Sequence, residues 1–221
     1  MKYGIIGALD EEVRLLTAEM AVTKTVEACG CTYYDGVLDG KAVTVVCCSV
    51  GKVNAAVCTT ILIREFGCEA VVNVGIAGAM GKGLRPLDVV LSREAVVHDL
   101  DPSAVKYYPF TRSFSGDERL LAAADAACGG ITHRIGRIAT GDQFIAGGEP
   151  AARIREAYAP DAVEMEGAAV AQVCHMNGVP FLIIRSMSDS ADEDANEVYD
   201  DFIDRAAAQS AQIVRGMLQR L

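Results

Sequence analysis

The chain has 221 residues, 51% of them hydrophobic, and a formal net charge of −10 at pH 7. This length fits one domain with a full hydrophobic core, and the apolar content excludes intrinsic disorder. The negative charge disfavours a nucleic acid or an anionic membrane as the main partner. No apolar run approaches the length of a transmembrane helix, and the apolar residues 3–9 are followed by the acids at 10–12, which argues against a signal peptide.

The eight cysteines and three histidines lack the spacing of a zinc site, since no two cysteines form a C-x-x-C pair. Most of the cysteines lie within apolar segments. We therefore expect reduced, buried thiols in a cytoplasmic protein, with no bound metal and no cofactor.

Strand-like and helix-like segments alternate through the first half of the chain. The predicted elements are a strand over residues 2–8, a helix over 10–20, a hairpin over 31–49, a helix over 51–67 and a strand over 69–75. The hairpin is expected to turn at Asp39-Gly40, and Gly67 to cap the second helix. A glycine-rich segment at 75–83 follows the strand and contains Ile76, Ala77 and Gly78.

The alternation continues in the second half. The predicted elements are a strand over 86–99, a loop over 100–116, a helix over 117–127, a strand over 131–141, a helix over 148–158, a short strand over 161–165, a helix over 166–178, a strand over 180–189 and an amphipathic helix over 196–221. The short connections predict an α/β fold, a single domain over residues 1–221 with a mixed central β-sheet flanked by helices on both faces.

Several acids lie just after predicted strands, where ligands bind in such sheets. Glu12, Glu164, Glu166 and Asp189 each have a structural alternative, because acids also complement or cap helix N-termini. Three consecutive acids at residues 10–12 exceed what capping needs, so we expect one of them to face inward. The later acids at 192–194 serve the last helix better than Asp189, which leaves Asp189 available for another role.

The residues around these acids suit a nucleoside ligand. Glu166 could accept hydrogen bonds from both hydroxyls of a ribose diol, with Met165 against the sugar or in the core. Phe144 would stack on a planar base or belong to the core, and the glycine-rich segment permits close approach of a ligand to the backbone. Because glycoside chemistry usually needs one carboxyl acid and one carboxyl base, this set suggests hydrolysis of a nucleoside's N-glycosidic bond.

Six segments together resemble a known family. They are GIIGALDEEV, VVNVGIAG, HDLD, TGDQFI, VEMEGAAVA and RSMSD, in this order. The chain resembles the 5′-methylthioadenosine/S-adenosylhomocysteine nucleosidase family of the purine nucleoside phosphorylase superfamily, from Met1 to the C-terminal helix. The resemblance implies a homodimer that releases adenine from 5′-methylthioadenosine, S-adenosylhomocysteine and 5′-deoxyadenosine.

The resemblance also implies catalytic roles. Glu12, which points to the hydrolase branch of the superfamily, would be the base that activates water. Asp189, oriented by Ser188, would be the acid that meets the purine N7 and exocyclic amine. Arg185 would support Glu12 and the water.

Substrate-binding roles follow in the same way. Met165 and Glu166 would hold the ribose, Phe144 would stack on adenine, and the Ile145 backbone would contact the edge of the base. Tyr199 would cover the 5′-substituent.

Two positions depart from the family's usual pattern. Ile76 stands where serine is common, and Val105 stands where an aromatic is common and would reach into the neighbouring subunit's pocket. Both changes touch the sugar or the 5′-pocket, so they leave the preferred 5′-substituent open.

Three alternatives remain. A futalosine or aminofutalosine hydrolase would share the chemistry with a bulkier 5′-group. A phosphorolytic purine nucleoside phosphorylase is disfavoured because such relatives place an arginine where Asn73 stands here, and because Glu12 would repel phosphate. A non-catalytic nucleoside-binding protein is disfavoured by the joint presence of Glu12, Glu166 and Asp189.

Overall fold

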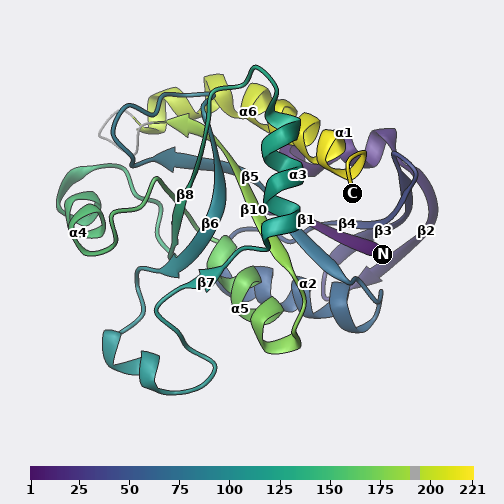
Figure 1. Ribbon diagram of the computed structural model, residues 1–221, viewed down its shortest axis with the longest axis horizontal. Coiled ribbons are helices and arrows are strands. Elements are labelled where there is room, and N and C mark those ends of the chain that lie inside the picture. Colours follow the sequence, from purple (N-terminus) through teal and green to yellow (C-terminus); the bar gives the residue numbers. More distant parts are fainter. Residues whose placement is uncertain (190–194) are drawn as a thin grey trace.

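A computed structural model describes residues 1–189 and 195–221, and for residues 189 and 195–202 it describes only the backbone (Figure 1). The helices are α1 (Asp10–Glu19), α2 (Lys52–Arg64), α3 (Glu118–Cys128), α4 (Gly148–Tyr158), α5 (Gly167–Asn177), α6 (Ala195–Leu218) and the 3₁₀ turn η1 (Pro102–Lys106). The strands are β1 (Lys2–Gly7), β2 (Ala21–Ala28), β3 (Cys31–Leu38), β4 (Lys41–Cys47), β5 (Ala70–Ala79), β6 (Val89–Val97), β7 (Phe114–Ser115), β8 (His133–Thr140), β9 (Ala162–Glu164) and β10 (Phe181–Asp189).

These elements confirm the predicted alternation of strands and helices, with three corrections. The sequence analysis missed β2, which is almost wholly exposed and so carries no buried apolar face that could reveal it. The expected loop at 100–116 contains η1 and β7. The strand expected to stop at residue 75 continues as β5 to Ala79, so Ile76, Ala77 and Gly78 lie on a strand instead of a loop.

The strands form one mixed sheet, as predicted, and part of it closes on itself. The strand order is β10-β6-β8-β9-β5-β1-β4-β3-β2, with β7 beside β6. Because β10 also pairs with β5, the strands β10, β6, β8, β9 and β5 form a closed ring, which β1, β4, β3 and β2 extend. β1, β5 and β10 are parallel neighbours, so their carboxyl ends meet at one edge.

Helices cover both faces of the sheet, as predicted. One apolar core contains residues of α1, α3 and α6, such as Leu16, Leu120 and Val214. A second contains residues of α2 and α5, such as Leu62 and Val170. Figure 1 shows α6 and α1 above the sheet, and α2 and α5 below it.

Local signals explain several element ends. Asp39 and Gly40 both have positive φ, 48° and 79°. A two-residue hairpin turn needs such values to match the right-handed twist of the two strands that it joins. The Asp117 side chain caps α3 by accepting from the Leu120 N–H at 2.9 Å. The α2 helix ends at Arg64, three residues before the expected cap at Gly67.

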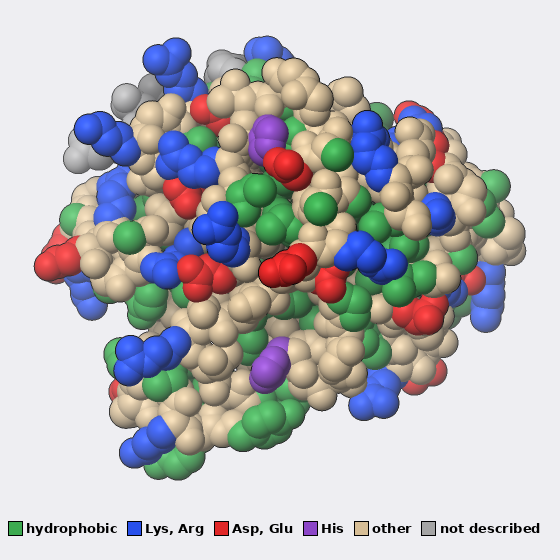
Figure 2. Space-filling view, viewed as in Figure 1, with side chains coloured by type: hydrophobic (Ala, Val, Ile, Leu, Met, Phe, Trp, Pro, Cys, Tyr) green, Lys and Arg blue, Asp and Glu red, His purple; other side chains and the backbone are tan. Residues whose placement is uncertain are grey.

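The surface and the thiols complete this description. Figure 2 shows acidic and basic side chains interspersed on the face seen there. All eight cysteines are free, and Cys29 is exposed, which corrects the expectation that these thiols are buried. Cys29 lies in the turn between β2 and β3. Because the sequence analysis missed β2, it also missed the turn that exposes this thiol. Over residues 1–189 and 195–221, no helix is long and apolar enough to cross a membrane.

Candidate active site

A cavity at the carboxyl ends of β1, β5, β9 and β10 gathers most of the predicted site residues. It is lined by Ala8, Leu9, Glu12, Val50, Ile76, Ala77, Gly78, Phe144, Val163, Glu164, Met165, Glu166, Arg185 and Ser188. Parallel pairing of β1, β5 and β10 explains why residues so distant in sequence meet there.

Glu12 is the acid of the 10–12 run that faces inward, with only 1% of its surface exposed. In the first turn of α1, its side chain folds back so that Oε2 accepts from the backbone N–H groups of Ala8 at 2.7 Å and Leu9 at 3.0 Å. Its Oε1 accepts from the N–H of Ile76 at 3.0 Å. A Cβ at Gly75 would collide with this oxygen, so a glycine there makes room for the carboxylate.

The electrostatics of Glu12 suit a base. Burial raises its pKa above the usual value, and the Arg185 charge and the backbone donors oppose this rise. Both oxygens accept hydrogen bonds from N–H groups, as an ionised carboxylate does. A carboxylate with a raised pKa holds an abstracted proton more firmly, which favours general-base chemistry near neutral pH.

Arg185 lies at the centre of the site and is 1% exposed. Its Nη2 pairs with Oε2 of Glu164 and lies 3.4 Å from Oε2 of Glu166. Its Nη1 lies 3.9 Å from Oε1 of Glu12. One buried cation therefore faces three buried carboxylates.

Glu166 precedes the first turn of α5 and is 3% exposed. Its Oε1 accepts from the Gly51 N–H at 2.8 Å, at the start of α2. Burial raises the pKa of Glu166 to about 7, against the lowering effect of Arg185. With Met165 beside it in the cavity lining, Glu166 can accept hydrogen bonds from a diol.

The segment after β8 brings Phe144 to the cavity, where its side chain is 51% exposed. Ile145 is buried and packs with α4 residues such as Ile154. Asp142 fixes this segment to α2, because its Oδ1 accepts from the Lys52 N–H at 2.8 Å. Phe144 is thus placed where a flat ring could stack on it.

Ser188 lines the cavity, and its hydroxyl donates to the Ala77 carbonyl at 3.4 Å. The backbone of Asp189 pairs with Gly78 at the end of β10. The side chains of Asp189 and Tyr199 lie outside the described residues, so their predicted roles stay predictions.

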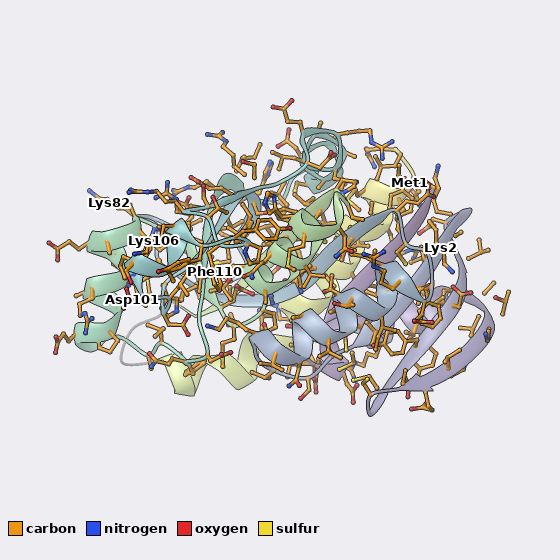
Figure 3. The ribbon with its side chains drawn as sticks, turned by 90° about the horizontal axis from the view of Figure 1, so that it is seen from below. Met1, Lys2, Lys82, Asp101, Lys106 and Phe110 are labelled. Carbon is orange, nitrogen blue, oxygen red and sulfur yellow. The ribbon has the colours of Figure 1, made fainter. Side chains whose placement is uncertain are left out.

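Val105 lies apart from this cavity. It belongs to η1 and lines a second cavity with Val96, Arg137 and Tyr158. Figure 3 shows Asp101, Lys106 and Phe110, which flank it in sequence, on the side of the molecule away from Met1 and Lys2. Val105 therefore does not line the cavity that holds Glu12 in the same chain, and its predicted role stays a prediction.

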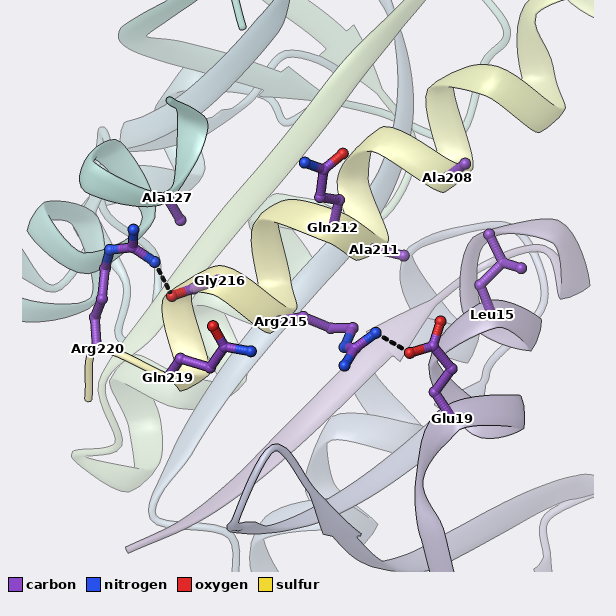
Figure 4. Close-up of a pocket in the computed structure, with 10 residues that line it drawn as sticks. All are labelled: Leu15, Glu19, Ala127, Ala208, Ala211, Gln212, Arg215, Gly216, Gln219 and Arg220. Carbon is purple, nitrogen blue, oxygen red and sulfur yellow. Dashed lines mark hydrogen bonds and ion pairs between the residues drawn. The ribbon is translucent and has the colours of Figure 1, made fainter. Parts of the chain in front are cut away.

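A groove between α1, α3 and α6 is lined by Leu15, Glu19, Ala127, Ala208, Ala211, Gln212, Arg215, Gly216, Gln219 and Arg220 (Figure 4). Its Arg215 pairs with Glu19 and with Asp39, whose Oδ2 lies 2.8 Å from Nε. Glu19, the acid in this lining, is thus held in a surface ion pair, and none of the sequence-predicted site residues lines the groove.

The sequence analysis gave no role to two buried polar residues of the site. Asn73 donates to the Ile6 carbonyl at 3.0 Å and accepts from Arg185 Nη2 at 2.7 Å. Thr140 donates from its hydroxyl to Glu164 and accepts from the Ala168 N–H at 2.8 Å. A polar residue inside the apolar run of β5 was the available signal for Asn73. No group of three or more His, Cys, Asp or Glu side chains within the described ranges is arranged to hold a metal ion.

The chain matches a known superfamily over almost its whole length. A family model described as the phosphorylase superfamily matches residues 2–219. The fold and the carboxylate-lined cavity accordingly define a nucleoside-cleaving enzyme of that superfamily.

Individual relatives refine the assignment. 5′-Methylthioadenosine/S-adenosylhomocysteine nucleosidases of Actinobacillus succinogenes and Anoxybacillus flavithermus are 40% and 38% identical, over all of this chain and 100% and 99% of theirs. The nucleosidase of Neisseria meningitidis, solved with methylthio-immucillin-A, has a TM-score of 0.95 and 40% identity, covering 100% of this chain and 99% of that one. A futalosine hydrolase of Helicobacter pylori has a TM-score of 0.94 and 34% identity, covering 100% and 98%.

The chain belongs to the 5′-methylthioadenosine/S-adenosylhomocysteine nucleosidase family and is an N-glycosyl hydrolase.

Proposed function

We propose that this chain, as one nucleosidase domain over residues 1–221, hydrolyses the N-glycosidic bond of adenine nucleosides with a modified 5′ end and releases adenine. The substrates are 5′-methylthioadenosine, S-adenosylhomocysteine and 5′-deoxyadenosine. The observation that carries the proposal is the buried Glu12 carboxylate, which lines the same cavity as Glu166 and Phe144. A neighbour from Colwellia psychrerythraea solved with adenine, 38% identical, supports an adenine-bearing substrate.

The residues divide the reaction between them. Glu166 accepts hydrogen bonds from the ribose hydroxyls, and Phe144 stacks on the base. Glu12 accepts a proton from water as the water attacks the sugar carbon, and the carbon–nitrogen bond to adenine breaks with both electrons going to the base. Asp189, oriented by Ser188, donates a proton or a hydrogen bond to the departing adenine.

Hydrolysis is favoured over phosphorolysis by the charges around the cavity. Phosphate would need cationic or backbone donors, whereas Glu12 presents a carboxylate there. Arg185 is already surrounded by Glu164, Glu166 and Asn73. The site has no cation among its described lining residues besides Arg185.

A futalosine-type hydrolase is the second candidate, because the Helicobacter pylori enzyme shares the fold over the whole chain. Leu9, Val50 and Ile76 line the cavity and carry no hydrogen-bond donor in their side chains. This apolar lining favours a thioether over a free hydroxyl at the 5′ end of the substrate.

A release assay tests these assignments. Adenine or hypoxanthine release is measured from 5′-methylthioadenosine, S-adenosylhomocysteine, 5′-deoxyadenosine, adenosine, inosine and aminofutalosine, with and without phosphate and with a chelator. We expect phosphate-independent turnover of the first three and a lower kcat/KM for adenosine. Turnover that scales with phosphate, or that is confined to aminofutalosine, would contradict the proposal.

The assembly and the compartment belong to the same proposal. A cytoplasmic homodimer, in which Val105 of one subunit and Tyr199 complete the 5′-pocket, fits several observations. The chain has eight free cysteines. Tyr107 and Tyr108, next to η1, are 60% and 77% exposed, and Val53 on α2 is 73% exposed. Large exposed apolar side chains close to a site suit an interface between copies.

A further inference from the structure

The carboxylate of Glu164 receives four hydrogen-bond donors. Its Oε2 accepts from the N–H of Gly167 at 2.7 Å, from the N–H of Glu166 at 3.0 Å and from Arg185 Nη2. Its Oε1 accepts from the Thr140 hydroxyl. Because both oxygens act as acceptors, the geometry is that of an ionised carboxylate.

The surrounding chain is shaped to hold this carboxylate in place. A Cβ at Gly167 would lie 3.1 and 3.2 Å from the two oxygens of Glu164, so the absence of a side chain at Gly167 gives the carboxylate room against the start of α5. Thr140 is itself fixed, because its hydroxyl accepts from the Ala168 N–H at 2.8 Å. Glu164 is therefore rigidly placed by β8 and α5.

Arg185 faces three carboxylates and makes its shortest contact with Glu164. Glu166 and Glu12 lie further from the guanidinium, at 3.4 and 3.9 Å. Asn73 accepts from Nη2 at 2.7 Å and the Ile76 carbonyl accepts from Nη1 at 3.2 Å, which fixes the plane of the group. Arg185 thus pairs most closely with Glu164, and its contacts with the two carboxylates that the reaction uses are longer.

We propose that Glu164 is a positioning residue that pairs with Arg185, so that Glu12 keeps its strength as a base and Glu166 remains available to the ribose hydroxyls. This inference rests on the function proposed above. A cation close to a carboxylate stabilises its ionised form and weakens it as a base. A cation already paired with Glu164 has less of this effect on Glu12 and Glu166.

The other titratable groups around Arg185 do not replace Glu164. Those that face the cluster are Glu12 on α1, Cys47 and Cys48 at the end of β4 and just beyond it, His98 after β6, Glu164, Glu166 and Arg185. Burial raises the thiol pKa values of Cys47 to about 11 and of Cys48 above its usual range, and burial lowers the pKa of His98. These three groups are therefore neutral near pH 7.

The first test titrates the carboxylates directly and needs no substrate. The full-length protein and its Glu164→Gln variant, both labelled with ¹³C at the glutamate side-chain carboxyl, are followed by NMR against pH. The Glu12→Gln and Glu166→Gln variants assign the two signals. Loss of Glu164 should move both titrations to lower pH, by about one unit or more. Unmoved titrations in a folded variant would overturn the proposal.

A second variant covers the case in which Glu164→Gln does not fold, as judged by circular dichroism. Glu164→Asp keeps the charge but places it one methylene further from Arg185. It should give a smaller shift in the same direction, and titrations at their wild-type positions would again overturn the proposal.

Kinetics with 5′-methylthioadenosine give a separate test. In Glu164→Gln the acid limb of kcat/KM against pH should move to lower pH and kcat should fall about tenfold or more. Thr140→Val is the matched control, because it removes an uncharged hydrogen-bond donor to Glu164 and keeps every charge. It should reduce turnover without moving the acid limb. A wild-type protein that releases no adenine would refute the proposed function, while the NMR titration would still decide the role of Glu164.

Discussion

At the scale of single residues, the site is defined by carboxylates whose environments differ. Glu12 and Glu166 are buried and have raised pKa values, and Glu164 is fixed by four donors. Such differences let neighbouring carboxyl groups take different roles at one pH. The cost of burying the two carboxylates at the start of the apolar α5 helix is therefore offset by hydrogen bonds from Arg185, Thr140 and backbone N–H groups.

Glu12→Gln should reduce kcat with 5′-methylthioadenosine at least about a hundredfold, because an amide cannot take a proton from water. The amide is nearly isosteric, so the melting temperature should stay close to that of the wild type. Steady-state kinetics and thermal unfolding of the same preparations check this. Near-normal turnover in a normally melting variant would remove Glu12 from the mechanism.

Glu166→Gln should stabilise the unliganded protein more at pH 8 than at pH 5. The folded-state pKa of Glu166, about 7, lies above the usual value of 4.5, so the folded state binds this proton more tightly. The associated stability is present below about pH 4.5 and is lost as pH rises through about 7, at a cost of up to about 3 kcal/mol. The amide that replaces Glu166 in the variant does not ionise, so the variant does not lose this stability as the pH rises.

Melting temperatures at the two pH values measure this effect, with about 2–4 °C expected per kcal/mol for a chain of this size. Glu149→Gln serves as the control, because it removes an exposed acid on α4. An equal change for Glu166→Gln at both pH values would argue against a raised pKa.

At the scale of elements, the N-terminus of α2 connects the two halves of the proposed site. Gly51 holds Glu166, and the next residue, Lys52, is bonded through its N–H to Asp142 at 2.8 Å. Lys52 Nζ pairs with Asp99 at 2.5 Å, and the Asp142 N–H donates to Asp99 at 2.9 Å. The segment that carries Phe144 is thus tied to the segment that holds Glu166, the proposed ribose-binding carboxylate.

Asp142→Ala should therefore raise KM several-fold with a smaller effect on kcat, because the segment proposed to bind the base loses its attachment to α2. Loss of the hydrogen bond that Asp142 accepts from the Lys52 N–H should also cost about 1 kcal/mol of stability. Glu149→Ala, which removes an exposed acid from the same region, is the control and should leave KM unchanged. A KM equal to that of the control in the Asp142 variant would refute the coupling of the two segments.

Most elements could be predicted from local signals in the sequence, whereas most roles in the candidate site came from the family resemblance and stay predictions. Periodicity located α1, α5 and β10, and the acids after strands pointed to Glu12 and Glu166. Exposed β2 left no periodic signal, and β5 ran through glycines that usually mark a loop. Closure of the ring pairs β10 with β5 and brings Arg185 to Asn73. These contacts join distant parts of the chain, so no local sequence pattern predicts them.

At the scale of the whole molecule, the isolated chain leaves Val105 outside the cavity that holds Glu12. Lys52 at the start of α2 pairs with Asp99, shortly before η1, so exposed Val53 and the segment containing Val105 lie on neighbouring parts of the surface. A second copy docked over α2 would cover these apolar side chains and bring its own Val105 segment toward the 5′ end of the substrate.

Val53→Glu should consequently convert the proposed dimer to monomers and raise KM for 5′-methylthioadenosine about tenfold or more, because a charge buried at an interface without a partner opposes association. Val22→Glu is the matched control, since Val22 is a 43% exposed valine on β2. It should leave both the mass and the kinetics unchanged. Sedimentation equilibrium at assay concentrations measures the mass. A wild-type monomer with full activity would refute the shared pocket, whereas a dimer unaffected by Val53→Glu would move the interface away from α2.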